Sequence, residues 1–200
     1  MQVLVIGTSL TAGLGLEDPA RQSWAGQLQA LADSAGLDVG IRNGGVSGDT
    51  SAGGLRRVRW MLRTPVDVLI VELGANDGLR GLGPAALEEN LREIVRVARA
   101  ADPAIEIALV AMEAPPNLGS DYTTAFREVY PRVAQDLSVT LVPFLLEGVA
   151  GVAELNQSDG IHPTARGHAL MARRAWPVLE PLLRRALAAQ APPSGEEAAA

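Results

Sequence analysis

The amino-acid sequence predicts an α/β protein: a three-layer α/β/α sandwich around a five-stranded parallel sheet with a flavodoxin-like strand order. Short runs rich in Val, Ile and Leu alternate along the chain with segments of helical period, and the links between them are short. The runs are apolar throughout rather than alternating, which is typical of strands covered by helices on both faces. Right-handed crossovers would join such strands into one parallel sheet.

The expected strands are apolar stretches at 2–7, 38–43, 67–73, 105–112 and 139–144. The expected helices lie at 22–36, 53–63, 84–101, 122–137 and, after the last strand, 163–190. The segment 84–101 illustrates the helical pattern, because apolar residues recur there at a 3.6-residue spacing from Leu87 onward. Pro84 stands near the first turn, where the missing N–H of a proline is tolerated.

Length and composition predict one domain at residues 1–190. A chain of 200 residues with a hydrophobic fraction of 48% can bury a sizeable core. We expect residues 191–200, which are rich in Pro, Ala and Glu, to form a disordered tail. The net charge of −6 offers no basic excess for a phosphate backbone, so no nucleic-acid partner is expected.

No apolar run approaches the roughly 20 residues that a membrane-spanning helix needs, so no transmembrane segment is expected. The chain opens directly on a strand pattern, without the charged region and cleavage site of a signal peptide. As the sequence stands we expect a soluble, cytoplasmic monomer. If an upstream signal peptide was removed, the expected location is periplasmic or secreted.

Three absences narrow the chemistry. The chain has no cysteine, all 17 basic residues are arginine, and the two histidines are His162 and His168. These absences exclude a thiol nucleophile, a disulfide, a cysteine-ligated zinc site, a Schiff-base lysine and a serine–lysine dyad. The two histidines are not spaced with acidic partners as metal ligands would be, so no metal or cofactor is expected.

The first expected strand runs into Gly-Thr-Ser, which places Ser9 at a strand-to-helix turn. Such a turn presents a hydroxyl and backbone N–H groups beyond the carboxyl end of a strand, where ligands bind in open α/β sheets. Ser9 is therefore a candidate nucleophile whose own N–H helps to hold an oxyanion. The alternative is that Ser9 caps a helix. Phosphate loops are excluded, because neither G-x-x-x-x-G-K-[ST] nor G-x-G-x-x-G follows this strand.

A serine hydroxyl needs a base to remove its proton, and the two histidines are the candidates. His162 follows Asp159 by three residues and precedes Pro163, which we expect in the first turn of the final helix. A short turn of this kind can bring the Asp159 carboxylate onto one imidazole nitrogen while the other nitrogen faces the serine. The alternative is a capped helix start with an incidental histidine. His168 has no comparable acidic neighbour, and we interpret it as structural.

Two further loops offer hydrogen-bond donors at the same edge of the sheet. The loop 43–50 concentrates three glycines, so a bare N–H of Gly48 could approach a ligand; the alternative is a flexible turn. The loop 72–78 offers the Asn76 amide, a neutral donor suited to a developing oxyanion; the alternative is an Asn-Asp-Gly turn. Each loop is a weak indication alone, but together they predict one site.

Taken together, these stretches resemble the SGNH hydrolases, also called the GDSL esterase and lipase family, and most of all its bacterial multifunctional thioesterase, lysophospholipase and arylesterase members. The matching stretches are GTSLTAG, GVSGDTS, VELGANDGLRG, FREVYP and DGIHP. They span residues 3 to 163 in the order of the family's elements. The combination is highly specific, although no single piece is.

The resemblance implies a role for each matched residue. Ser9 is the nucleophile, His162 and Asp159 complete the triad, and the N–H groups of Ser9 and Gly48 form the oxyanion hole with the Asn76 amide. One residue departs from the family pattern, because Thr8 stands where the family usually has aspartate. That aspartate is not a triad member, so the departure concerns the local hydrogen bonding of the nucleophile turn.

The resemblance implies a serine esterase that acts on short acyl and aryl esters, with thioesters and lysophospholipids as further candidate substrates. The expected partner is a small-molecule ester, and the loops 78–84 and 113–122 are expected to shape the acyl pocket. One alternative is a carbohydrate acetylesterase of the same family, which uses the same five residues and differs in the rim. Another is a non-catalytic, flavodoxin-like ligand-binding domain, in which Asp159 and His162 would have no function.

Overall fold

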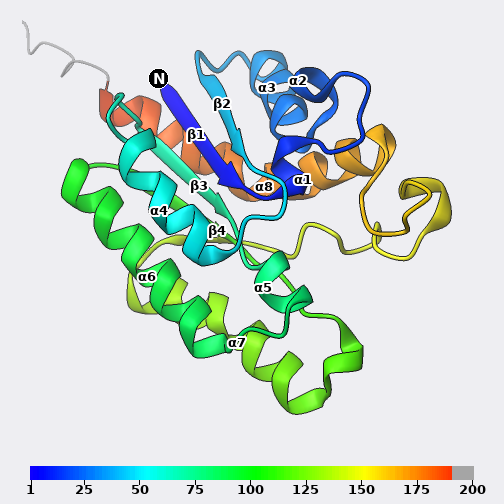
Figure 1. Ribbon diagram of the computed structural model, residues 1–200. Helices are drawn as coiled ribbons and strands as arrows, with labels where there is room; N and C mark the ends of the chain where they lie inside the picture. The colour runs from blue at the N-terminus through cyan, green and yellow to red at the C-terminus, as the bar shows by residue number, and fades with distance from the viewer. Residues whose placement is uncertain (191–200) are drawn as a thin grey trace, which may run out of the picture.

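The computed structural model describes residues 1–190, and the tail predicted at 191–200 lies outside them. Figure 1 shows one parallel sheet with the strand order β2-β1-β3-β4-β5. The strands are β1 (Gln2–Gly7), β2 (Gly40–Gly45), β3 (Val68–Glu72), β4 (Glu106–Val110) and β5 (Thr140–Val142). Every strand pair is parallel, which confirms the predicted α/β class with a five-stranded parallel sheet.

Helices cover both faces of the sheet (Figure 1). The long helices are α3 (Trp24–Ser34), α4 (Ser51–Met61), α6 (Pro84–Ala101), α7 (Ser120–Asp136) and α8 (Ala165–Gln190). The short elements are α1 (Ser9–Ala12), α2 (Pro19–Gln22), α5 (Ala75–Leu79) and the 3-10 turns Pro116–Leu118 and Ala153–Leu155. Helix α3 packs beside α8 on one face, and α6 packs between α4 and α7 on the other.

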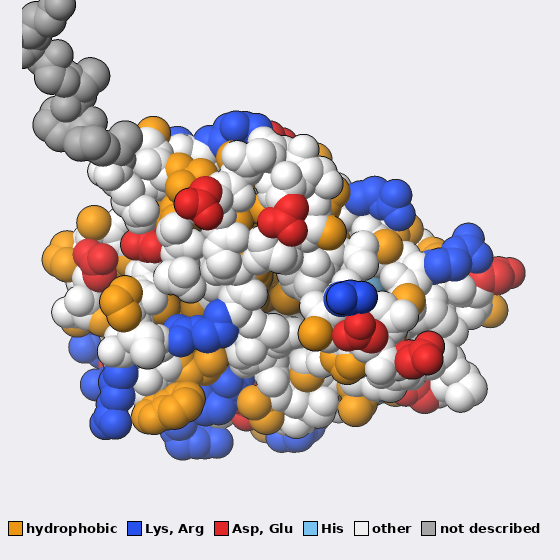
Figure 2. Space-filling view, turned by 90° about the horizontal axis from the view of Figure 1, so that it is seen from above, with side chains coloured by type: hydrophobic (Ala, Val, Ile, Leu, Met, Phe, Trp, Pro, Cys, Tyr) orange, Lys and Arg blue, Asp and Glu red, His pale blue; other side chains and the backbone are white. Residues whose placement is uncertain are grey.

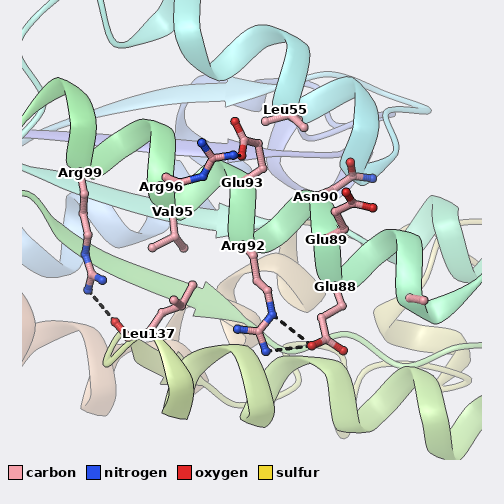
Figure 3. Close-up of a pocket in the computed structure, with 11 residues that line it drawn as sticks. Leu55, Glu88, Glu89, Asn90, Arg92, Glu93, Val95, Arg96, Arg99 and Leu137 are labelled. Carbon is pink, nitrogen blue, oxygen red and sulfur yellow. Dashed lines mark hydrogen bonds and ion pairs between the residues drawn. The ribbon is translucent and has the colours of Figure 1, made fainter.

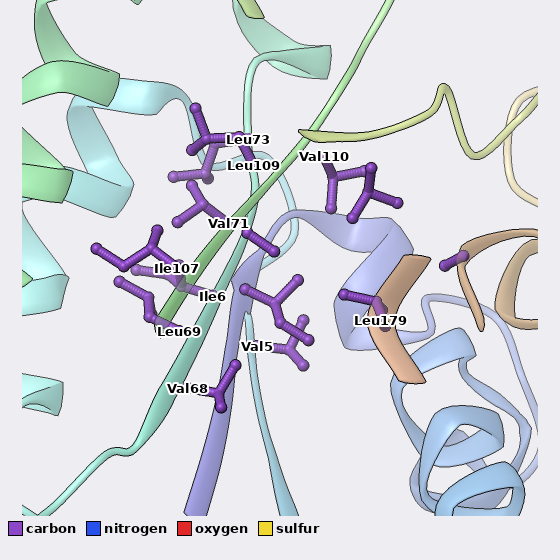
Figure 4. Packing of buried hydrophobic residues seen from close by; sticks show 14 of the residues in the cluster. Val5, Ile6, Val68, Leu69, Val71, Leu73, Ile107, Leu109, Val110 and Leu179 are labelled. Atoms are coloured by element: carbon purple, nitrogen blue, oxygen red, sulfur yellow. The ribbon is translucent and has the colours of Figure 1, made fainter. Parts of the chain in front are cut away.

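The apolar strands form the core because their alternating side chains enter both helix layers. Figure 4 shows Leu69 and Ile107 on the side of α4 and α6, and Val5 and Val110 on the opposite side, toward Leu179 of α8. All of these side chains are buried. The central strand β3 is buried along its whole length, including Glu72 at its carboxyl end.

The edge strand β2 differs from the prediction in position and in character. It runs over Gly40–Gly45 rather than 38–43, so Gly44 and Gly45, which were assigned to the following loop, belong to the strand, and its side chains are partly exposed. Pairing with β1 extends it, since the register continues to Gly45 opposite Gly7. Gly45 allows this because a Cβ there would lie 2.1 Å from the backbone nitrogen of Ala12. The expectation of an apolar strand covered on both faces is therefore wrong for β2.

The solvent-facing surface carries charges of both signs. Figure 2 shows acidic side chains spread over one face of the molecule, and arginine side chains that are densest at the lower left and also lie along the top and the right. Within residues 1–190, none of the helices is both long and apolar enough to cross a membrane.

Candidate active site

A cleft of about 640 Å³ opens beyond the carboxyl ends of the strands. It is lined by residues that follow each of the five strands, and those after β5 belong to the long connection that leads to α8. Ser9, Gly48, Asn76 and His162 all lie on its wall. The remaining lining is mainly apolar and includes Leu10, Leu14, Leu79, Met112, Phe144, Leu146 and Ile161.

A larger hollow of about 850 Å³ lies elsewhere, along α6 (Figure 3). Its walls are lined by charged side chains that bond to their neighbours. Arg92 lies 2.8 Å from Glu88, and Arg99 donates to the Leu137 carbonyl at 2.7 Å. Neither a serine nor a histidine lines this hollow. The cleft beyond the strand ends therefore combines a candidate nucleophile, a candidate base and an apolar lining, and we interpret it as the candidate active site.

Ser9 is the first residue of α1, and Thr8 alone separates it from the end of β1 at Gly7. The N-cap of α1 is Thr8, whose hydroxyl accepts the Leu10 N–H at 3.4 Å. The alternative that Ser9 itself caps a helix is therefore wrong. As the first helical residue, Ser9 has a backbone N–H that no carbonyl within the helix can accept. The side chain is partly exposed and lines the cleft.

The structure brings His162 between Ser9 and Asp159. Its Nε2 lies 3.0 Å from Ser9 Oγ, and its Nδ1 lies 2.6 Å from Asp159 Oδ2. The other carboxylate oxygen, Oδ1, accepts the backbone N–H groups of Ile161 and His162 at 2.9 and 3.0 Å. The hydrogen bond from the His162 side chain, aided by the two backbone bonds, lowers the pKa of Asp159 to about 2. This carboxylate is thus anionic at neutral pH and holds the imidazole by one nitrogen.

His162 lies in a short turn whose two sides bond to each other. Asn156 and Pro163 form an isolated antiparallel bridge, and the Gln157 N–H donates to the His162 carbonyl at 2.8 Å. Pro163 therefore belongs to this turn. The prediction that it lies in the first turn of the last helix is wrong. Helix α8 begins at Ala165, two residues later than expected. The bridge explains the shift, because it holds the chain extended up to Pro163.

Gly48 and Asn76 line the cleft beside Ser9. Gly48 has φ = +80°, a conformation that favours glycine, and its carbonyl accepts from Arg80 at 2.8 Å. Asn76 lies in α5, so the alternative of an Asn-Asp-Gly turn is wrong. Its Nδ2 donates to the Asp49 carbonyl at 2.9 Å, which fixes the amide between the two loops and leaves a second N–H on the same nitrogen.

His168 lies outside the cleft lining, as its structural interpretation requires. It is buried in α8, where Nδ1 accepts the Trp24 N–H at 3.2 Å at the start of α3. Burial, with a smaller effect of the charge on His162, lowers the pKa of His168 to about 4. The imidazole is therefore neutral at pH 7 and acts as a helix-terminal acceptor.

Glu72 is the polar residue that reasoning from the sequence missed. It ends the apolar run of β3, is 0% exposed, and accepts hydrogen bonds from Thr8 and Thr11 on both sides of Ser9. Burial raises the pKa of this carboxyl to about 7, against the lowering effect of those hydrogen bonds. The signal was present, since an acidic residue at the end of a buried strand needs donors that only the neighbouring loops can supply.

Comparison with known proteins gives the family. The GDSL-like lipase/acylhydrolase family matches residues 5–170. The esterase TesA of Pseudomonas aeruginosa is 43% identical over 182 residues, which cover 90% of this chain and 89% of that protein. Thioesterase 1/protease 1/lysophospholipase L1 of Escherichia coli K12 is 37% identical, covering 90% and 84%. A crystal structure of TesA superposes with a TM-score of 0.85 at 42% identity, covering 91% of this chain and 99% of that one.

The chain belongs to the GDSL-like lipase/acylhydrolase family, which confirms the resemblance drawn from its motifs. It is a carboxylic ester hydrolase.

The pKa of His168 generates a prediction for stability. Its unfolded value of 6.5 exceeds its folded value of about 4, so the unfolded chain binds the proton first as the pH falls. We expect the contribution of His168 to the free energy of unfolding to be fully present above pH 6.5 and to be lost as the pH falls from 6.5 to 4. Over that range the unfolding equilibrium constant should change by at most about tenfold per pH unit. His168→Asn keeps an acceptor for Trp24 without that ionisation and should lack this drop.

Urea unfolding of both proteins between pH 8 and 4 measures the difference. Glu72 acts in the opposite direction, because its raised pKa contributes stability that is lost as the pH rises from 4.5 to about 7. Both proteins share that contribution, so only their difference reports on His168. Parallel curves for wild type and variant would show that His168 does not titrate as described.

Proposed function

We propose that the protein hydrolyses carboxylic esters through an acyl-enzyme on Ser9. The observation that carries the proposal is the continuous chain from Ser9 Oγ to His162 Nε2 at 3.0 Å and from His162 Nδ1 to Asp159 Oδ2 at 2.6 Å. His162 takes the hydroxyl proton as Ser9 Oγ bonds to the carbonyl carbon, and then returns it to the leaving alcohol. A water molecule, deprotonated by the same imidazole, attacks the acyl-enzyme and releases the acid and free Ser9.

Asp159 supports the imidazolium that forms in each half-reaction. Because its pKa is about 2, the carboxylate is ionised at neutral pH while His162 gains and returns the proton. The bond at Nδ1 fixes the imidazole tautomer, so the lone pair of Nε2 faces Ser9 Oγ. The carboxylate itself does not take the proton.

The N–H groups of Ser9 and Gly48 and the amide of Asn76 are proposed to bind the oxyanion. The support is their common position on the cleft wall and the anchoring of the Asn76 amide by Asp49. Their hydrogen bonds strengthen as negative charge develops on the carbonyl oxygen, and each donor contributes on the order of 3 kcal/mol in sites of this kind.

The apolar lining of the cleft favours short acyl and aryl esters as substrates. Leu79 from the loop 78–84, and Glu113 and its next three residues from the loop 113–122, form part of the wall. The Escherichia coli relative carries the name thioesterase and lysophospholipase, which extends the proposal to thioesters and lysophospholipids. An acetylated sugar would leave much of this apolar wall without a partner, so the esterase is favoured over the carbohydrate acetylesterase.

Removal of Ser9 or His162 should abolish turnover. We expect Ser9→Ala and His162→Ala to lower kcat on p-nitrophenyl acetate on the order of a thousandfold or more, because each removes a group that acts in proton or acyl transfer. His168→Asn and Ser120→Ala should stay near the wild-type rate, since both residues lie outside the cleft lining. Steady-state kinetics, with folding checked by circular dichroism, decides; near wild-type turnover by folded Ser9→Ala refutes the acyl-enzyme.

Chelators should leave the rate unchanged. Among residues 1–190 there is no group of three or more His, Asp or Glu side chains placed to hold a metal ion, and the proposed steps use only side chains and water. Turnover of the same ester before and after EDTA treatment tests this expectation. Loss of activity that a divalent ion restores would contradict the mechanism.

A further inference from the structure

A buried carboxylate lies directly beneath the proposed nucleophile. Glu72 is the last residue of β3 and pairs in the sheet with Gly7, two residues before Ser9. Its Oε2 accepts the Thr8 N–H at 3.0 Å, the Thr11 N–H at 3.2 Å and the Thr11 hydroxyl at 2.6 Å. Its Oε1 accepts the Thr8 hydroxyl at 3.0 Å. One carboxylate thus accepts from residues on both sides of Ser9.

These hydrogen bonds supply acceptors for backbone N–H groups that have no partner within the short helix α1. A helix of four residues, Ser9–Ala12, is far below the length at which helices are stable alone, and the backbone N–H groups of its first turn have no partner within the helix. Glu72 accepts two N–H groups at that end, from the N-cap Thr8 and from Thr11. The backbone of Ser9 is therefore held from below by a residue of a different element.

The surroundings leave Glu72 little freedom to move. Thr11 Oγ1 accepts the indole N–H of buried Trp24 at 3.1 Å while donating to the carboxylate, so the network continues into α3. A Cβ at Gly7 would lie 2.6 Å from Glu72 Oε2 and 2.1 Å from Thr11 Oγ1. The carboxylate can approach the turn this closely because position 7 has no side chain.

We propose that Glu72 is a positioning residue for the reaction: through Thr8 and Thr11 it holds the backbone of Ser9 so that the hydroxyl faces His162 and the N–H faces the substrate oxygen. The proposal rests on the proposed role of Ser9. Misplacement of a reacting group by about 1 Å can cost on the order of a hundredfold in rate, even when the substitution lies away from the reacting atoms. Loss of Glu72 should therefore lower kcat and leave KM nearly unchanged, because the substrate contacts the cleft wall and not Glu72.

Two substitutions at position 72 separate positioning from mere burial. In Glu72→Gln, the amide oxygen can take the place of Oε2 and accept its three donors, while the NH₂ group faces Thr8 Oγ1, which can rotate to accept. Glu72→Met has similar volume but offers no comparable acceptor. We expect kcat within about threefold of wild type for Glu72→Gln and lower by roughly 10- to 100-fold for Glu72→Met, with KM within about twofold for both.

Val71→Ala serves as the matched control for lost stability. Val71 precedes Glu72 in β3, is equally buried, and points to the opposite face of the sheet, away from the Ser9 turn. The truncation leaves a small cavity and lowers the thermal unfolding midpoint, but it should leave kcat within about twofold of wild type. Thermal unfolding and circular dichroism give the folded fraction, to which each kcat is normalised.

If Glu72→Met does not fold, the pair Thr11→Ser and Thr11→Val provides the same comparison. Serine keeps the hydroxyl that donates to Glu72, whereas valine removes it, so kcat should fall about tenfold for Thr11→Val only.

Three results would overturn the proposal. The first is wild-type kcat in folded Glu72→Met or Thr11→Val. The others are a kcat for Glu72→Gln, or for Val71→Ala, that is as low as that of Glu72→Met. Inactive Ser9→Ala beside fully active Glu72 variants would refute this inference alone, whereas active Ser9→Ala would refute the proposed function.

Discussion

The parallel register at the centre of the sheet determines where β1 ends, and the candidate site depends on that end point. Gly7 pairs with Gly45 of β2 on one side and with Glu72 of β3 on the other. A side chain at position 7 would collide with the buried carboxylate and with α1. Because the position is glycine, the chain turns at once into α1 above that carboxylate, and Ser9 comes to lie within hydrogen-bond distance of His162.

The two carboxylates near the nucleophile differ because their environments differ. Asp159 is exposed and receives bonds from His162, so its pKa falls to about 2 and its stabilising effect is lost only as the pH drops from 3.8 toward that value. Glu72 is buried, and its pKa rises to about 7. Thr8, which departs from the family's usual aspartate, donates its hydroxyl to Glu72, a bond that an ionised aspartate could not make.

Patterns that repeat along the chain could be predicted, and contacts between distant segments could not. The apolar runs and the helical spacing predicted the sheet and its five long helices. The sequence motifs predicted Ser9, Gly48, Asn76, Asp159 and His162 as candidate site residues, and the structure brings them to one region. The short helices α1, α2 and α5 have four or five residues, too few for a period to be seen. Glu72 was missed for a different reason, since its four donors come from residues more than 60 positions away and become partners only when β1 and β3 pair.

Covalent labelling of the nucleophile tests whether Ser9 carries the acyl group during turnover. The wild-type protein is treated with an organophosphonate that reacts with activated serine hydroxyls, and the modified residue is located by mass spectrometry of its peptides. We expect one phosphonyl group per chain, on Ser9, and no modification of folded His162→Ala on the same timescale. A phosphonyl group on another serine, or unmodified Ser9 in a protein that hydrolyses esters, would contradict this role of Ser9.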